Sequence, residues 1–159
     1  MAPIALLSVC RRHKRRQKKE RIAIAIVNRE IELHDTRIQR IELVGSSIVL
    51  WLSAYMHESK GRPGLDRGTG WSLPARLVVE NGKFDRPFSS PSLCVADGHV
   101  SVGDRRFDNC IPMPFDERGK IRLFLSGGEG ELVISGDRTY LEPTGPAVCI
   151  EEFSGSDEI

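Results

Sequence analysis

The feature that most constrains the fold of this chain is a series of short runs in which apolar and polar residues alternate. In residues 121–125, for example, the isoleucine and both leucines occupy alternate positions. A period of two residues is typical of a strand with one buried face. Strand-like runs recur between turn signals at 22–33, 37–44, 48–56, 75–82, 93–96, 99–102, 106–111, 131–135, 138–142 and 147–153. Many short strands with turns about every ten residues predict an all-β protein, folded as a single antiparallel β-sandwich or barrel-like domain.

The first 21 residues differ in composition from the rest. They carry eight Lys or Arg against one Glu, a net charge of +7, whereas the other 138 residues carry a net charge of −6. Self-repulsion keeps such a run out of a core. We therefore expect a basic N-terminal arm or short helix (1–21), a β-domain (22–154) and a disordered acidic tail (155–159). A helix across 11–33 competes with the strand at 22–33, but the β-branched residues there favour the strand.

The sequence shows no sign of membrane insertion or secretion. The longest uncharged run, residues 43–57, has 15 residues, and a membrane-spanning helix needs about 20 predominantly apolar ones. The N-terminus places its apolar segment before its charged segment, the reverse of a signal peptide. We therefore expect a cytoplasmic protein that has no membrane partner.

The four cysteines, at positions 10, 94, 110 and 149, lie far apart in the sequence. In a cytosolic protein such residues are most simply small buried side chains. A disulfide between Cys94 and Cys110 stays open if the strands that flank them are neighbours. The close ligand pairs typical of structural zinc are missing, and no nucleotide-binding, hydrolase or metalloprotease motif is present. We expect neither a metal nor a cofactor.

Residues 57–72 interrupt the pattern, because they lie between two predicted strands and have no periodicity of their own. Connections longer than about 12–15 residues are uncommon in compact domains and are usually functional or disordered. The candidate binding residues here are His57, Arg62, Asp66, Arg67 and Trp71. The arginines can bind a carboxylate or phosphate, and Trp71 can anchor the loop. Alternatively, Arg62 and Asp66 pair with each other and only hold the loop's shape.

A His-Asp-Thr sequence at residues 34–36 lies where one predicted strand ends and the next begins. His34, oriented by Asp35, is a candidate acid, base or ligand, and we include both among the candidate binding residues. On a regular strand, however, adjacent side chains point to opposite faces, and Asp and Thr commonly form turns. We favour the turn. A metal site formed by His34, His57 and Asp66 is disfavoured, because no close ligand pair supports it.

Three of these segments resemble a group of small bacterial β-rich proteins: His34-Asp35-Thr36, Ala54-Tyr55-Met56-His57, and the Gly-Arg-Pro-Gly-Leu-Asp-Arg-Gly-Thr-Gly-Trp sequence of residues 61–71. The closing strands, through Glu151-Glu152-Phe153, are similar to those of the group as well. The resemblance covers about residues 30–154, and the loop is its most specific part. The group has Ser at the third position of the first motif, and Thr36 keeps the hydroxyl. The resemblance implies a compact β-rich domain, and it implies no activity because none is attached to the group.

Three functions follow from this reading of the sequence. The first, our working hypothesis, is a non-enzymatic domain that binds another protein through residues 57–71 as its recognition edge. The weakest of the three is a hydrolase-like enzyme that uses His57 and Asp66, because catalysis depends on a geometry that the sequence does not supply. The second is polyanion or nucleic-acid binding by the basic arm, unless the arm is only a solvated tail; its candidate residues are Arg11, Arg12, Lys14, Arg15, Arg16, Lys18, Lys19 and Arg21.

Overall fold

The computed structural model describes residues 27–155, so the basic arm lies outside the described range. Within this range the chain forms no helix, and hence none that could span a membrane. The expected all-β fold is confirmed for these residues. Its strands are β1 (Asn28–Val44), β2 (Ser47–Ser59), β3 (Gly68–Glu80), β4 (Lys83–Phe84), β5 (Leu93–Cys94), β6 (Asp97–Val102), β7 (Arg105–Asp108), β8 (Cys110–Pro112), β9 (Asp116–Gly127), β10 (Gly130–Pro143) and β11 (Val148–Phe153).

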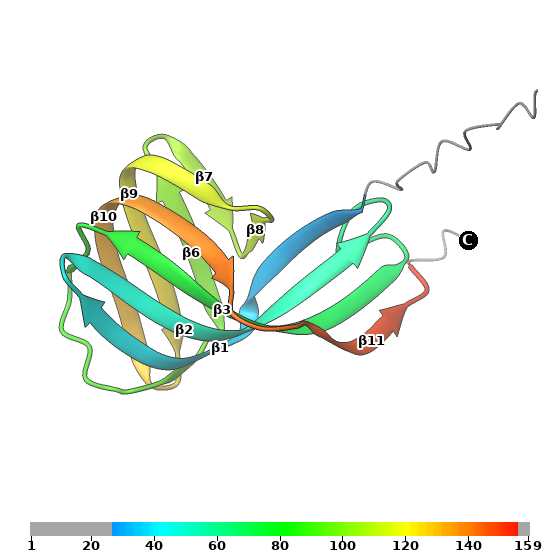
Figure 1. The fold of residues 1–159 in the computed structure, drawn as a ribbon, viewed down its shortest axis with the longest axis horizontal. Helices are drawn as coiled ribbons and strands as arrows, with labels where there is room; N and C mark the ends of the chain where they lie inside the picture. Colours follow the sequence, from blue (N-terminus) through cyan, green and yellow to red (C-terminus); the bar gives the residue numbers. More distant parts are fainter. Residues whose placement is uncertain (1–26, 156–159) are drawn as a thin grey trace, which may run out of the picture.

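These strands form one antiparallel sheet that curls into a half-barrel, the body on the left of Figure 1. The main path runs β5-β1-β2-β3-β10-β9-β6-β7, while β11 pairs with β3, β4 with β10 and β8 with β1. The segment after β5 links two sides of the curl. The amide of Val95 donates to the carbonyl of Thr36 in β1 (3.0 Å), and the amide of Ala96 donates to the carbonyl of Ser126 in β9 (2.8 Å).

The core lies inside the curl of the half-barrel. Alternate apolar side chains of the long strands point into it, and fully buried examples are Ile38, Leu50, Leu77, Leu123 and Leu132. Burying one side chain of this size contributes about 1.5–3 kcal/mol. The alternation in the sequence is therefore the alternation of core-facing and outward-facing side chains.

Three strands continue beyond the half-barrel. Figure 1 shows β1, β2 and β3 leaving the body together and running to the right, where β11 joins them. We call this extension the ribbon, which comprises residues 28–32 of β1, 55–59 of β2, 68–72 of β3 and all of β11. Residues 60–67, the tip loop, connect β2 to β3 at its end. The ribbon and the tip loop together carry five of the seven candidate binding residues.

The prediction that residues 57–72 form an irregular connection between strands is wrong at both ends of the segment. Residues 57–59 belong to β2 and residues 68–72 to β3, which leaves only the tip loop outside the strands. Glycine has no side chain and therefore shows no alternation of apolar and polar positions. The glycines at 68 and 70 thus hid the start of β3 from a pattern-based prediction.

Two predicted turns lie within continuous strands. The chain does not turn back at residues 136–137, where β10 instead continues with a register shift against β9. The break predicted at residues 34–36 is likewise a bulge within β1. A local turn sequence and a bulge use the same residue types, because both need backbone conformations outside the regular strand.

The cysteines differ in part from expectation. Cys94 and Cys149 are exposed and Cys110 is half-buried, so the prediction of small buried side chains is wrong for the first two. All three are free thiols, and Cys94 and Cys110 form no disulfide. Cys10 lies outside the described residues.

Candidate functional site

The ribbon leaves the half-barrel at the bulge in β1. On the ribbon side of the bulge, Glu32 pairs with Tyr55 of β2. The next pair is Arg37 with Ser53, so residues 33–36 of β1 lie opposite a single residue of β2. A bulge bends its strand and increases the local twist. It also takes the side chains around it out of the regular alternation of faces.

The hydroxyl of Thr36 replaces backbone partners at the bulge. Thr36 is buried, and its Oγ1 donates to the carbonyl of Glu32 (2.7 Å) and accepts from the amide of Tyr55 (3.3 Å). Asp35 has a φ of 70°, a left-handed conformation that Asp adopts more readily than most residues. The turn chemistry predicted at these positions is therefore used inside a continuous strand.

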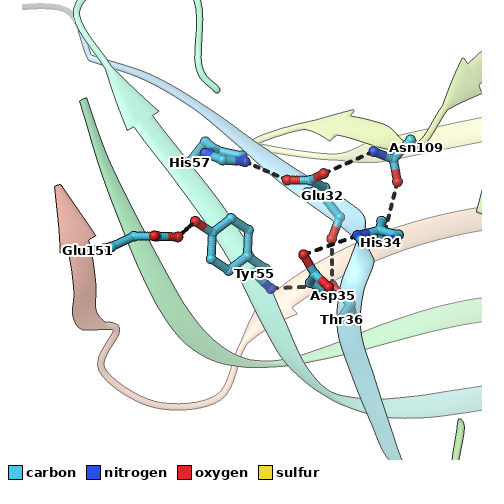
Figure 2. Close-up of polar contacts among 8 residues, drawn as sticks. All are labelled: Glu32, His34, Asp35, Thr36, Tyr55, His57, Asn109 and Glu151. Atoms are coloured by element: carbon cyan, nitrogen blue, oxygen red, sulfur yellow. Dashed lines mark hydrogen bonds and ion pairs between the residues drawn. The ribbon is translucent and has the colours of Figure 1, made fainter. Parts of the chain in front are cut away.

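Asn109, between β7 and β8, holds the bulge from the neighbouring side. Its carbonyl accepts from the amide of Leu33 (2.6 Å), and its Oδ1 accepts from the amide of His34 (2.8 Å). Its Nδ2 donates to Glu32 Oε1 (3.3 Å). Figure 2 shows both side-chain contacts. One residue thus fixes both the backbone of the bulge and the carboxylate beside it.

His57 is the centre of a polar cluster on the outer face of the ribbon, and it is only 8% exposed. Its Nε2 lies 2.6 Å from Glu32 Oε2, as Figure 2 shows. An ionised carboxylate only accepts hydrogen bonds, so Nε2 is the donor of this pair in the tautomer that fits an ionised Glu32. The other ring nitrogen, Nδ1, is buried and has no hydrogen-bond partner among residues 27–155.

Three neighbours enclose the imidazole of His57. The ring of Tyr55 meets it edge-on with 4.8 Å between centroids, and the ring of Phe153 lies 5.5 Å away. Gly64 of the tip loop lies over the imidazole, since a Cβ at that position would be 3.5 Å from it. Together with the bond to Glu32, these contacts join β1, β2, β11 and the tip loop around one side chain.

A second contact ties β11 to β2 across β3. The hydroxyl of Tyr55 hydrogen-bonds to the carboxylate of Glu151, and Figure 2 shows the hydroxyl directed toward that carboxylate. The contact passes over Gly70 of β3. A Cβ on Gly70 would lie 2.5 Å from the Tyr55 hydroxyl and 2.8 Å from Glu151 Cγ. The absent side chain at Gly70 therefore makes this contact possible.

The tip loop is held by its own polar contacts. Arg62 and Asp66 form an ion pair (Nη2 to Oδ1, 3.0 Å), and the amide of Arg62 also donates to Asp66 Oδ2 (2.6 Å). These hydrogen bonds hold the pKa of Asp66 below its ordinary value. Asn28 Nδ2 donates to the carbonyl of Gly61 (2.7 Å). The loop presents Leu65, which is 59% exposed, on this fixed frame.

β11 has an open edge. One side of the strand pairs with β3, and no strand within residues 27–155 pairs with the other side. Val148 and Ile150 are 61% and 54% exposed, and Cys149 and Glu152 are exposed as well. An unpaired edge with apolar side chains is a template for pairing with another chain.

An apolar hollow lies on the opposite face of the ribbon from His57, near the segments that join β8 to β9 and β10 to β11. Its volume is about 230 Å³. At its rim, Arg29 Nε and Glu58 Oε2 form an ion pair at 2.8 Å. Besides these two residues, the hollow is lined by Met56, Trp71, Leu73, Met113, Pro143 and Ala147.

The other predicted binding residues lie apart from the cluster around His57. His34 and Asp35 form an exposed pair, with 3.0 Å between Nδ1 and Oδ2. Their side chains meet although both residues lie within β1, because the bulge breaks the regular alternation of faces. Trp71 is partly buried against the core, as expected of an anchor. Arg67 lines an open groove at the tip together with Glu152.

The residues named for the enzyme hypothesis have separate partners. His57 bonds to Glu32, whereas Asp66 bonds to Arg62. Among residues 27–155, no three or more His, Cys, Asp and Glu side chains gather as a metal site would require. The eight basic residues between Arg11 and Arg21 lie outside the described range.

Sequence reasoning missed the partners of His57 because each comes from another part of the chain. The polar pattern gave no sign of these contacts. Only the Tyr-x-His spacing carries a signal, since residues two apart share one face of a strand. The residues of the cluster that were not proposed as site residues are Glu32, Tyr55 and Phe153, which contact His57, together with Asn109 and Glu151, which bond to Glu32 and Tyr55.

Comparison with known proteins gives no relative from which a function could be transferred. No protein-family model, curated protein or solved structure matches the chain significantly. The resemblance of the sequence motifs therefore stays a prediction, and function has to be argued from geometry.

Proposed function

We propose that this protein is a domain that binds another protein through the edge of its ribbon, formed by β11 and the tip loop. The observation that carries the proposal is the open side of β11 with its exposed Val148 and Ile150. An extended segment of a partner can add to such an edge, with main-chain hydrogen bonds supplying affinity and side chains supplying specificity.

The contacts around His57 support this function by fixing the edge in advance. Phe153 and Glu151, both in β11, contact His57 and Tyr55 of β2, and Gly64 places the tip loop against the same imidazole. A surface that is already ordered loses less conformational entropy on binding. The cluster is thus a support for the recognition edge.

Charge on β11 favours a different chain over a second copy as the partner. Glu151 and Glu152 are adjacent on the strand, and both are exposed. Antiparallel pairing of two β11 strands would bring both carboxylates of each copy, four in all, into one short stretch. Like charges placed opposite each other across strands are destabilising.

Site-directed photo-cross-linking tests the proposal. A photoreactive residue is placed in the full chain at Ile150, at Leu65 or, as a control, at Leu43, which is exposed at the far end of β1. We expect the same protein to cross-link at Ile150 and Leu65 in extracts of the source cells, and not at Leu43. Cross-linking only at Leu43, or at none of the three positions, would overturn the proposal.

The net charge of +7 in residues 1–21 favours polyanion binding as a second candidate function. Binding of the full chain to duplex DNA should weaken steeply as salt rises, because phosphate contacts release counterions. Replacing all eight Lys and Arg of the arm with Gln should abolish it. If the substituted chain binds DNA as well as the original does, the candidate fails.

A further inference from the structure

The apolar hollow lies beside the open edge of β11. Cys149 of β11 pairs with Trp71 of β3, which lines the hollow, and Ala147, just before β11, lines it as well. Cys149 and Ala147, which both have small side chains, therefore lie between the hollow and the open edge. In a strand added to β11, every second side chain would point toward the face that carries the hollow.

The size and lining of the hollow suit an amino-acid side chain. Its volume of about 230 Å³ is below the roughly 300–1,000 Å³ typical of small-molecule sites. Trp71 and Leu73 come from β3, while Met56 and Met113 supply flexible thioethers. Methionine adapts to differently shaped apolar groups, so the hollow can accept more than one aliphatic or aromatic side chain.

The charge of the edge indicates which charged residues an added strand would carry. Residues 148–155 contain two carboxylates, Glu151 and Glu152, and no Lys or Arg. Glu152 pairs with Thr69 of β3, so it shares the face of the hollow with Cys149, and it is exposed. A basic side chain on the same face of an added strand would lie against Glu152.

We propose that the hollow is a specificity pocket for one apolar side chain of an extended, basic segment of a partner protein, which adds as a strand to β11. This inference rests on the proposed function and names the chemistry of its ligand. Backbone pairing provides the register, the hollow takes the apolar side chain, and Glu152 selects the basic residue that shares its face.

Selection of peptides from a random display library on the immobilised full chain tests the inference. We expect the enriched peptides to share an apolar residue with Lys or Arg on the same strand face. Ala147→Leu, which fills the hollow, and Glu152→Lys should each weaken binding of a selected peptide by about tenfold or more. The matched controls are Thr144→Leu, on the same linker but outside the hollow, and Asp104→Lys, in the turn between β6 and β7.

Replacing the apolar residue of the selected peptide with alanine gives a readout that does not depend on how the protein variants fold. It should weaken binding as much as Ala147→Leu does. Peptides that lose affinity with Glu152→Lys but tolerate both changes at the hollow would overturn the pocket and leave the proposed edge function standing. Enrichment of acidic peptides would overturn the charge assignment. No enrichment over a surface without the protein would overturn both proposals.

Discussion

At the bulge of β1, one hydroxyl takes the place of two backbone partners. Thr36 Oγ1 accepts from one strand and donates to its own, in a buried position. A buried polar group that loses its partner costs more than the hydrogen bond itself contributes. The hydroxyl, more than the rest of the side chain, is therefore what this position requires.

Thr36→Val should lower the free energy of unfolding by about 1–3 kcal/mol, because the isosteric valine leaves Glu32 O and Tyr55 N without a partner. Thr36→Ser keeps the hydroxyl and loses one methyl group, at a cost of about 0.8 kcal/mol. Urea unfolding of the three proteins measures the difference. Equal stability of Thr36→Val and the original chain would contradict this account of the bulge.

His99 makes stability depend on pH. Burial, with Arg106 nearby, lowers the pKa of His99, whose ring stacks on Phe124. The unfolded chain therefore takes up a proton first as the pH falls below about 6.5. The contribution of His99 to the free energy of unfolding is fully present above that pH. It decreases as the pH falls further, until the pH is below the lowered pKa of the folded form. Between pH 7 and pH 5 the original chain should lose more stability than His99→Gln, as chemical unfolding at each pH measures; equal losses would contradict the assignment.

At the scale of elements, Gly70 controls how firmly β11 is attached. Gly70→Ala should push the Tyr55 hydroxyl away from Glu151 and speed amide exchange in residues 148–153. In a Tyr55→Phe background that hydroxyl is already gone, so the same substitution should have a smaller additional effect. Native-state hydrogen exchange on the four proteins gives the coupling. Strictly additive effects would show that Gly70 and Tyr55 act independently.

The elements themselves were largely predictable, and their boundaries were less so. Alternation predicted the strand at 121–125, because one of its faces meets the core, and the turn after it predicted the strand at 131–135 that pairs back. The beginning of β3 was missed because its glycines carry no side chain to alternate. The bulge at 34–36 was mistaken for a turn, since only the pairing with β2 shows that the strand continues beyond it.

The site could be predicted only in part, because its contacts are long-range. The sequence drew attention to His57, and a local ion pair between Arg62 and Asp66, four residues apart, was foreseeable. The contact of Tyr55 with Glu151 joins residues 96 positions apart. It exists because β2, β3 and β11 are neighbours in the sheet, and that order follows from the whole topology.

At the scale of the whole molecule, the half-barrel is a base and the ribbon extends from it. β1, β2 and β3 are fixed in the half-barrel by the core and continue into the ribbon. The packing of the body therefore also holds the ribbon in place. The ribbon ends in an edge whose apolar side chains are balanced by two carboxylates. Charged residues on an edge strand are a common protection against uncontrolled pairing.

Glu152→Val should therefore make the full chain self-associate. It removes one carboxylate from the edge and leaves an apolar stretch next to Val148 and Ile150. Sedimentation with a reductant present, which keeps Cys149 reduced, should show a mass that increases with concentration. Asp104→Val is the matched control and should behave like the original chain. Identical sedimentation of both variants would argue against an open edge.

The proposed function requires a partner protein to bind the edge formed by β11 and the tip loop. Amide exchange measured by NMR on the full chain, with and without the protein that cross-links at Ile150, tests this most directly. We expect slower exchange in residues 60–67 and 148–153 and no change at the exposed turn after Leu43. Slower exchange confined to that turn or to the half-barrel would contradict it.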